Sequence, residues 1–218
     1  MPEWYPIMID IQGRACVVIG GGAVAERKAR GLLEAGALVR VVSPSLTPSL
    51  AELAQSGDIQ ILDRFYRDGD LAGAVLAFAA TDDPETNAAV LREARQRGVP
   101  ANAAAGGAEG DFIVPAVVRR GDLVLTASAS GGGPAVAARI AGELARRYGP
   151  EYEPYLKTMR RVREAIKTQV ADSEERRRLL AAAATEETFA EWADIGSEAV
   201  GISELIERLR VRALGGKG

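Results

Sequence analysis

Three glycines follow an apolar run near the N-terminus, and a helix-forming segment begins directly after them. Residues 16–28 read CVVIGGGAVAERK. In the pattern G-x-G-x-x-A, Gly20 permits a tight strand-to-helix turn, Gly22 lets a phosphate approach the backbone, and Ala25 lets the helix pack on a sheet. The free N–H groups and the dipole at a helix N-terminus attract anions. These residues therefore predict a site for the pyrophosphate of a dinucleotide, with a purely structural turn as the alternative.

The second expected strand ends in Val42-Ser43-Pro44-Ser45. Many NAD sites carry an acidic residue here, which holds the ribose hydroxyls. A serine hydroxyl can also bond a ribose, but it has no charge to distinguish NAD from NADP. From the residues alone, we expect only a slight preference for NAD over NADP.

The composition excludes several classes of protein. The 218 residues contain no histidine and one cysteine, and the formal net charge is −3. The lack of histidine excludes His-based metal sites and Ser–His or Cys–His catalytic pairs. The single Cys16 excludes a disulfide framework and is expected to be a buried, inert thiol. Neither nucleic-acid nor membrane binding is expected, and the absence of a signal pattern predicts a cytoplasmic protein.

Strands and helices are expected to alternate over the first hundred residues, which favours an α/β fold with a parallel, doubly wound sheet. The expected strands span residues 15–20, 38–43, 59–62, 75–80 and 99–102, and the expected helices span residues 23–35, 45–55 and 83–97.

The pattern changes near residue 113. Two strand-like runs, 112–118 and 123–128, flank a tight connection at Gly121, and a helix is expected over 135–148. The remainder reads as helical, with Ser173 and Thr185 as expected N-caps. Basic residues between 160 and 178 alternate with acidic ones, so we interpret them as solvated helix faces rather than an RNA-binding surface.

Polar residues follow two of the expected strands at the edge where open α/β sheets bind ligands. Thr81 and Asp83 follow the fourth strand. Asp83 also has the position of a helix cap, and we expect both roles, with Ala80 and Thr81 lining a cofactor cleft. Asn102 ends the fifth strand, where it could contact a nicotinamide or a substrate, or simply occupy a turn.

Four segments together resemble the precorrin-2 dehydrogenase family, the NAD-dependent enzymes of sirohaem (porphyrin-type) biosynthesis. The segments are YPI from Tyr5, GGGAVAERKARGLLEAGA from Gly20, AATDD from Ala79 and FIVP from Phe112. The resemblance, which covers about residues 4–180, implies oxidation of precorrin-2 to sirohydrochlorin by NAD, a homodimer, and in some relatives ferrochelatase activity. It implies a Rossmann-like domain over 1–112, a dimerisation region over 113–150 and a helical C-terminal domain over 151–214.

The implied tetrapyrrole substrate carries many carboxylates, so hydroxyls, backbone N–H groups and cations should line its site. The glycine-rich stretch that begins at Ser128 offers such groups, with a flexible linker as the alternative. We expect the substrate to contact Asn102, Asp111, Phe112, Pro115, Ser128, Ala129, Ser130, Gly131, Gly132, Pro134 and Arg139. We expect the cofactor to contact Gly20, Gly21, Gly22, Ala23, Val24, Ala25, Ser43, Pro44, Ser45, Ala80, Thr81 and Asn102.

One position departs from the family. Relatives carry an aspartate, regarded as the acid/base and chelation residue, three residues after this asparagine, where this chain has Ala105. Alanine can neither move a proton nor bind a metal ion. Three explanations compete: alteration of the position to trap a ligand, transfer of the role to Glu109 or Asp111, or loss of activity. The intact motifs elsewhere favour the first, and we expect no metal site and only weak metal insertion.

Two other classes of function stay open. A non-catalytic NAD-responsive redox sensor would suit Ala105, but the sequence shows no DNA-reading module. The second class is a dehydrogenase that acts on another small substrate. The helical C-terminal part and the stretch that begins at Ser128 argue against it, because they favour a large polyanionic ligand.

Overall fold

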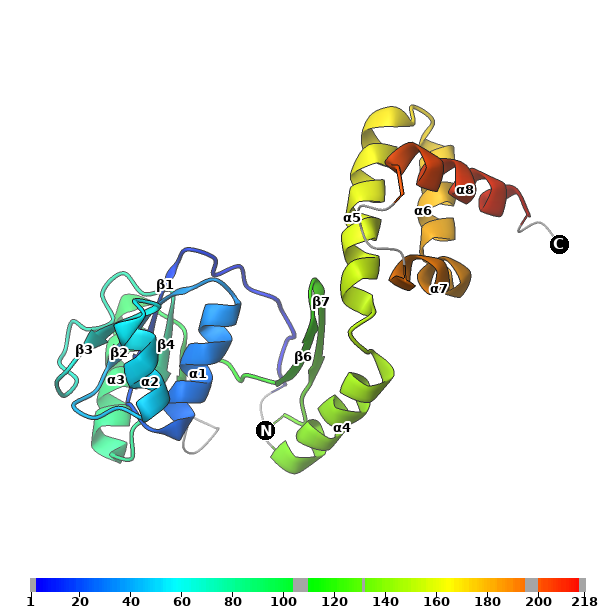
Figure 1. Cartoon of the computed structure of the whole chain (residues 1–218). Coiled ribbons are helices and arrows are strands. Elements are labelled where there is room, and N and C mark those ends of the chain that lie inside the picture. Colours follow the sequence, from blue (N-terminus) through cyan, green and yellow to red (C-terminus); the bar gives the residue numbers. More distant parts are fainter. Residues whose placement is uncertain (1–2, 104–109, 131, 195–199, 216–218) are drawn as a thin grey trace. The chain divides into compact units, whose positions relative to one another are not determined.

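The computed structural model describes residues 3–103, 110–130, 132–194 and 200–215 (Figure 1). The chain divides into two compact units, Met1–Val114 and Pro115–Gly218. Ala105, Glu109 and Gly131, which were singled out in the sequence, lie outside the described residues.

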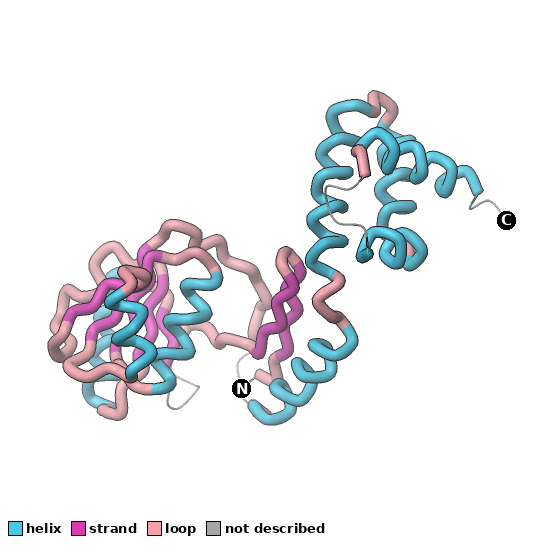
Figure 2. Tube along the Cα trace, viewed as in Figure 1, coloured by secondary structure: helices cyan, strands magenta, loops and turns pink. Residues whose placement is uncertain are grey.

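The first unit is built on a five-stranded sheet in which every neighbouring pair is parallel. The strand order is β3-β2-β1-β4-β5, and Figure 2 shows helices on both faces of the sheet. This arrangement confirms the expected Rossmann-like, doubly wound fold. The strands are β1 (Ala15–Ile19), β2 (Leu38–Val42), β3 (Ile59–Leu62), β4 (Leu76–Ala79) and β5 (Ala101–Ala103), and the helices are α1 (Ala23–Glu34), α2 (Pro48–Gln55) and α3 (Pro84–Arg97).

Two apolar cores cover the two faces of this sheet. Helices α1 and α2 pack on the face that carries Cys16 and Val18, and α3 packs on the face that carries Val17 and Ile19. These strand residues are fully or almost fully buried, as the continuous apolar run predicts for a strand covered on both sides. Cys16 is fully buried, as expected, and burial raises the pKa of its thiol to about 11.

The connection between β3 and β4 spans residues 63–75, all of which are described, and it contains no helix. Arg64 makes two hydrogen bonds to the carboxylate of Asp70, at 2.7 and 2.8 Å. Glu93 of α3, which is 2% exposed, accepts the backbone N–H groups of Gly69 and Leu71 at 3.0 and 3.3 Å. In this connection, which has no crossover helix, buried carboxylates thus accept hydrogen bonds from backbone N–H groups.

Three elements begin two or more residues later than the sequence predicts. Helix α2 begins at Pro48 rather than Ser45, because the hydroxyl of Thr47 accepts the N–H of Leu50 at 3.2 Å and caps the helix there. The fifth strand is Ala101–Ala103 rather than 99–102, and the sixth begins at Ala116 rather than at 112. The segment before Ala116 is instead bonded to β5, as described below.

The second unit starts with an antiparallel hairpin of β6 (Ala116–Arg120) and β7 (Leu123–Ala127). Gly121 adopts a φ of +55° in its turn, a region that favours glycine. Helix α4 (Pro134–Arg147) packs on the hairpin. The guanidinium of Arg120 donates to the carbonyls of Ala145 and Tyr148, both at 3.1 Å, and so satisfies the end of α4.

Four helices complete this unit: α5 (Tyr152–Gln169), α6 (Ser173–Ala183), α7 (Glu186–Asp194) and α8 (Ile202–Gly215). Their core centres on the fully buried Trp192. Thr185 caps α7 as expected, since its hydroxyl accepts the N–H of Thr188 at 3.3 Å. The expected cap of α6 is wrong: Asp172, not Ser173, accepts the N–H of Glu175 at 2.6 Å.

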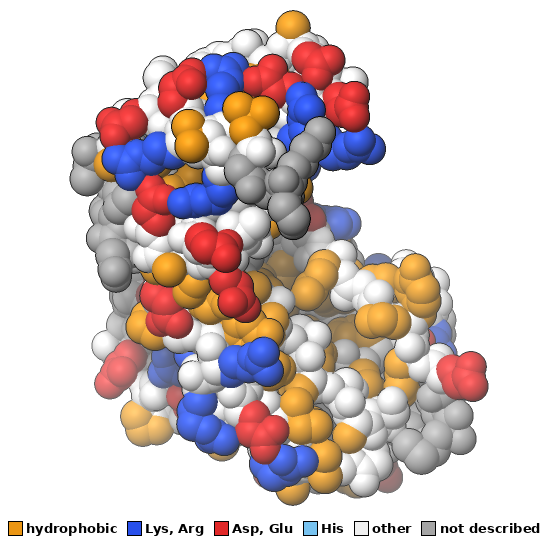
Figure 3. Space-filling view, turned by 90° about the vertical axis from the view of Figure 1, so that its right-hand side faces the viewer, with side chains coloured by type: hydrophobic (Ala, Val, Ile, Leu, Met, Phe, Trp, Pro, Cys, Tyr) orange, Lys and Arg blue, Asp and Glu red, His pale blue; other side chains and the backbone are white. Residues whose placement is uncertain are grey.

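Acidic and basic side chains are interspersed on the helices at the top of Figure 3. Several of them pair, including Lys167 with Glu164 and Arg210 with Glu175. This surface fits the interpretation of solvated helix faces. Within the described ranges, no helix has the length and apolarity that crossing a membrane requires.

Candidate functional site

The three glycines of the turn between β1 and α1 have different surroundings. Gly20 has a φ of +122°, and a Cβ there would lie 2.3 Å from the carbonyl oxygen of Ala80. A Cβ at Gly21 would lie 1.9 Å from the carbonyl oxygen of Ser45. A Cβ at Gly22 would meet no described atom within 4 Å. Two glycines therefore close the turn against its neighbours, and the third faces open space.

That open space lies at the start of α1. Gly22 is the N-cap, with φ −83° and ψ −174°, and no described side chain caps the helix. Ala23 and Val24 are exposed, whereas Ala25 is buried against the sheet. The first N–H groups of a helix lack intrahelical partners and carry a partial positive charge. An uncapped helix start beside a glycine fits the pyrophosphate of a dinucleotide.

We call the glycine turn and the two loops beside it the cradle. The loop between β2 and α2 forms one of its rims. The N–H of Thr47 donates to the carbonyl of Gly21 at 2.9 Å, and its hydroxyl donates to Glu26 of α1 at 2.7 Å. The bonds from Thr47 and Arg30 hold the pKa of the Glu26 carboxyl below its usual value. The sequence analysis did not select Thr47 or Glu26. They lie 21 residues apart, and nothing in the local sequence of either one indicates their contact.

Ser43 supports this rim from its buried side. Its side chain is buried, and its hydroxyl donates to the carbonyl of Ser45 at 2.7 Å. Pro44 and Ser45 are exposed. Of the three residues expected at the ribose, the structure therefore presents Pro44 and Ser45 at the surface and uses Ser43 as a brace.

The loop between β4 and α3 forms the opposite rim. The Ala80 carbonyl lies against Gly20, as its predicted collision with a Cβ shows. Thr81 is held by Asn87 of α3, whose Oδ1 accepts the Thr81 N–H at 3.2 Å and whose Nδ2 donates to the Thr81 carbonyl at 2.9 Å. Asp83 caps α3 by accepting the N–H groups of Glu85 and Thr86, which confirms its expected structural role. Asn87 was missed because helical periodicity assigns it only to a buried face.

The end of β5 is bonded to the segment that follows the undescribed residues. Asn102, which is buried, donates from Nδ2 to the carbonyl of Phe112 at 2.9 Å. Asp111 accepts the N–H of Ala101 at 3.0 Å and donates its own N–H to the Ala101 carbonyl at 2.8 Å. The ring of Phe112 packs edge-on against Phe78 of β4, with centroids 5.4 Å apart. Asn102 and Asp111 therefore tie β5 to the segment that begins at Gly110.

The other expected substrate residues belong to the second unit. Pro115 precedes β6, and the Ser128–Pro134 stretch leads from β7 into α4. Ser130 has a φ of +51°, and its N–H donates to the hydroxyl of Ser128 at 3.2 Å. The N–H of Gly132 donates to the carbonyl of Ala129 at 2.9 Å. Arg139, on α4, pairs with Glu143. The described part of this stretch is a hydrogen-bonded helix entry rather than an extended linker.

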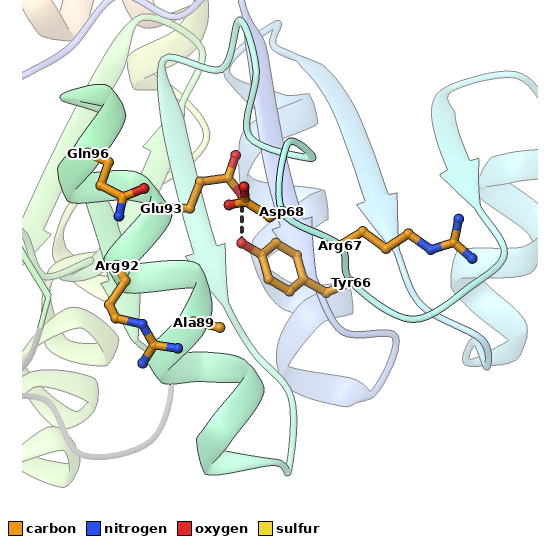
Figure 4. Close-up of a pocket in the computed structure, with 7 residues that line it drawn as sticks. All are labelled: Tyr66, Arg67, Asp68, Ala89, Arg92, Glu93 and Gln96. Atoms are coloured by element: carbon orange, nitrogen blue, oxygen red, sulfur yellow. Dashed lines mark hydrogen bonds between the residues drawn. The ribbon is translucent and has the colours of Figure 1, made fainter.

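Two surface pockets lie among residues that the sequence did not select. One, of about 280 Å³, is lined by Tyr66 and Glu93 and their neighbours (Figure 4). The Tyr66 hydroxyl donates to Glu93 at 2.5 Å, and burial together with that carboxylate raises the pKa of Tyr66. The other, of about 440 Å³, is lined by Glu191, Arg208, Val211 and Arg212. The described ranges hold no group of three or more potential metal ligands.

Comparison with known proteins identifies the family of the first unit. A family described as "Putative NAD(P)-binding" matches residues 7–116, about half of the chain. The chain belongs to this NAD(P)-binding family. Membership agrees with the open, uncapped glycine turn that lies within the matched residues.

The curated relatives of this NAD(P)-binding chain include proteins named "Siroheme synthase". This chain is 39% identical to the siroheme synthase of Pseudomonas aeruginosa (strain LESB58) over 175 residues, which are 80% of this chain and 38% of the relative. It is 37% identical to that of Chromobacterium violaceum over 176 residues, or 81% of this chain and 37% of the relative. The chain thus spans less than two fifths of the length of these relatives.

A solved structure titled "SirC, precorrin-2 dehydrogenase" shares the fold. Its TM-score is 0.76 at 24% sequence identity, and the match covers 95% of this chain and 100% of that one. At this identity the match establishes a common fold across both units.

Proposed function

We propose that this protein is an NAD-dependent dehydrogenase that oxidises precorrin-2 to sirohydrochlorin in sirohaem biosynthesis. The observation that carries the proposal is the open Gly22 at the uncapped start of α1. The names of the relatives and of the structural neighbour supply the substrate class. The chain's dinucleotide turn supplies the site that such an oxidation needs.

The reaction transfers two electrons, and its balance is precorrin-2 plus NAD⁺ giving sirohydrochlorin, NADH and H⁺. When bound, NAD supplies the hydride acceptor. The backbone N–H groups of Ala23 and Val24 would hold the pyrophosphate, and Pro44 and Ser45 would hold the adenosine half. Thr81 and Asn102 would hold the nicotinamide half. This division follows the two rims of the turn described above.

The macrocycle's carboxylates are assigned to the helix entry before α4. Ser128 and Ser130 offer hydroxyls, the uncapped start of α4 offers backbone N–H groups, and Arg139 offers a cation. Charge-assisted bonds of this kind hold carboxylates well. Arg139 must exchange its exposed partner Glu143 for the substrate, which costs little because exposed ion pairs are weak.

The proton released with the hydride needs an acceptor. Ala105 cannot accept it, and one oxygen of Asp111 already accepts the Ala101 N–H. We therefore expect slow turnover, with solvent or Asp111 taking the proton. Metal insertion into sirohydrochlorin, which would need a ligand at position 105, is expected to be weak. A non-catalytic NAD-binding protein is the second candidate function, and Ala105 is the observation that favours it.

NAD is proposed over NADP because Arg40 on β2 and Arg64 after β3 are already engaged. The Nε of Arg40 donates to Gln60 at 2.9 Å, and Arg64 is bonded to Asp70. A 2′-phosphate is usually held by such a cation. Isothermal titration with each dinucleotide tests this choice: we expect tighter binding of NAD, and equal or tighter binding of NADP would overturn it.

The proposal includes a cytoplasmic homodimer. Exposed apolar side chains near the N-terminus support self-association, namely those of Tyr5, Ile7 and Met8. Sedimentation equilibrium tests the assembly, with twice the chain mass of 23.0 kDa as the expected result. A single species of one chain mass would overturn the homodimer.

A further inference from the structure

We propose that Asn87 is a positioning residue of the cofactor site, which acts through Thr81 to orient the peptide that stands over Gly20. This inference rests on the proposed function, because it assigns a residue to the dinucleotide cleft. Asn87 lies within α3, outside the glycine turn and outside the residues selected from the sequence.

The side chain of Asn87 uses both of its polar atoms on one residue. Its Oδ1 lies 3.2 Å from the Thr81 nitrogen and 2.8 Å from the Thr81 hydroxyl oxygen, and its Nδ2 lies 2.9 Å from the Thr81 carbonyl oxygen. Asn87 is 9% exposed. A buried carboxamide whose two polar atoms both bond one loop residue holds that residue in a single orientation.

The held peptide is the one that touches the glycine turn. The Ala80–Thr81 peptide is planar and trans, so its N–H and its carbonyl point in opposite directions. Because the Thr81 N–H points to Asn87, the Ala80 carbonyl points away from it, to within 2.3 Å of where a Gly20 Cβ would stand. Asn87 thereby fixes the carbonyl that stands beside Gly20.

The same helix supplies a matched control. Glu93, six residues further along α3, is also buried, and it also holds the backbone of a neighbouring connection, at Gly69 and Leu71. That connection leads into the start of β4, which pairs with the start of β1 and so lies at the edge opposite the glycine turn. Glu93→Gln should therefore lower stability as a loss of a buried bond does, without altering the cofactor cleft.

The test measures NAD affinity by isothermal titration and thermal unfolding for the full chain and its variants. We expect Asn87→Leu to weaken NAD binding about tenfold, as the loss of a few buried hydrogen bonds permits. Thr81→Val should have a smaller effect, because it removes the hydroxyl contact with Asn87 and leaves the two backbone contacts in place. Glu93→Gln should lower the unfolding temperature and leave NAD affinity unchanged.

Wild-type affinity in folded Asn87→Leu would overturn the inference. An equal loss of affinity in Glu93→Gln would also overturn it, because the effect would then be general destabilisation. If Asn87→Leu does not fold, Asn87→Asp replaces it: Asp keeps the acceptor for Thr81 and loses the donor, so weaker binding is still expected. Absence of NAD binding by the unaltered chain would be a failure of the proposed function itself.

Discussion

Gly20 and Gly22 stand two residues apart in one turn and have opposite surroundings. Gly20 is pressed against the Ala80 carbonyl at a positive φ, whereas Gly22 has an extended backbone and an open side. A substitution at Gly20 therefore acts on the fold, and a substitution at Gly22 acts on the ligand.

We predict that Gly22→Asp weakens NAD binding without loss of stability. Aspartate is a better N-cap than glycine by a few tenths of a kcal/mol, so the free energy of unfolding should stay equal or rise slightly. The added carboxylate repels the pyrophosphate and occupies its place, which should weaken NAD binding at least about tenfold. Isothermal titration and urea unfolding measure the two effects.

Gly20→Ala is the control for this variant. Its Cβ collides with backbone at a φ of +122°, so we expect destabilisation of about 1–3 kcal/mol. NAD binding by Gly22→Asp as tight as that of the unaltered chain would refute the assignment of the turn.

Individual residues also show where sequence reasoning ends. The pattern at Gly20, Gly22 and Ala25 predicts a turn because each requirement is local, and the structure has that turn. Ser43 and Asn87 depend on partners that the fold brings to them, such as the Ser45 carbonyl and Thr81. A pattern of residue types contains no record of these pairings.

At the scale of elements, the β3–β4 connection depends on an ion pair instead of a helix. Arg64 and the Arg67 N–H bond to Asp70, and the Arg64 bond is the main cause that holds the pKa of the Asp70 carboxyl below its usual 3.8. A carboxyl with a lowered folded pKa stabilises the fold above its unfolded pKa. That contribution is lost as the pH falls through the lower, folded value.

We predict that Asp70→Asn lowers the free energy of unfolding at neutral pH by about 1–3 kcal/mol, because Arg64 loses its partner. The same variant should show a shallower loss of stability as the pH falls below 3.8. Urea unfolding across this range measures both effects. Asp68→Asn, in the exposed part of the same connection, is the control. A steep acid loss retained in full by Asp70→Asn would contradict the account.

Element order was predictable where each boundary has its own local signal. Gly98 ends α3 in a left-handed conformation, and Asp83 with Pro84 begins it, as the sequence predicts. The start of α2 was misplaced because Ser45 and Thr47 are both good caps, and only the bond from the Leu50 N–H selects Thr47. The start of β6 was misplaced because Asn102 and Asp111 hold the preceding apolar residues against β5.

At the scale of the whole molecule, the two units have separate cores. The cores of Met1–Val114 lie on the two faces of the sheet, and those of Pro115–Gly218 lie around α4 and among the last four helices. The dinucleotide turn belongs entirely to the first unit. The serines and the arginine assigned to the substrate belong to the second.

We predict that residues 1–114 alone fold and bind NAD within about threefold of the affinity of the full chain, because every residue of the cradle is present. The same fragment should form no NADH from precorrin-2, since Ser128 and Arg139 are missing. Circular dichroism and isothermal titration measure folding and binding. A folded fragment that binds no NAD would show that the cradle needs the second unit.

The central claim is tested most directly by NADH formation from precorrin-2 and NAD⁺ under anaerobic conditions, comparing this chain with Ala105→Asp. We predict slow NADH formation by this chain and a rate about a hundredfold higher for Ala105→Asp, within the range of general acid–base catalysis. Gly22→Asp, added to Ala105→Asp, should slow the reaction at least about tenfold when NAD⁺ is limiting. Equal, fast rates would show that position 105 takes no part in proton transfer, and no NADH from either chain would contradict the proposed dehydrogenase.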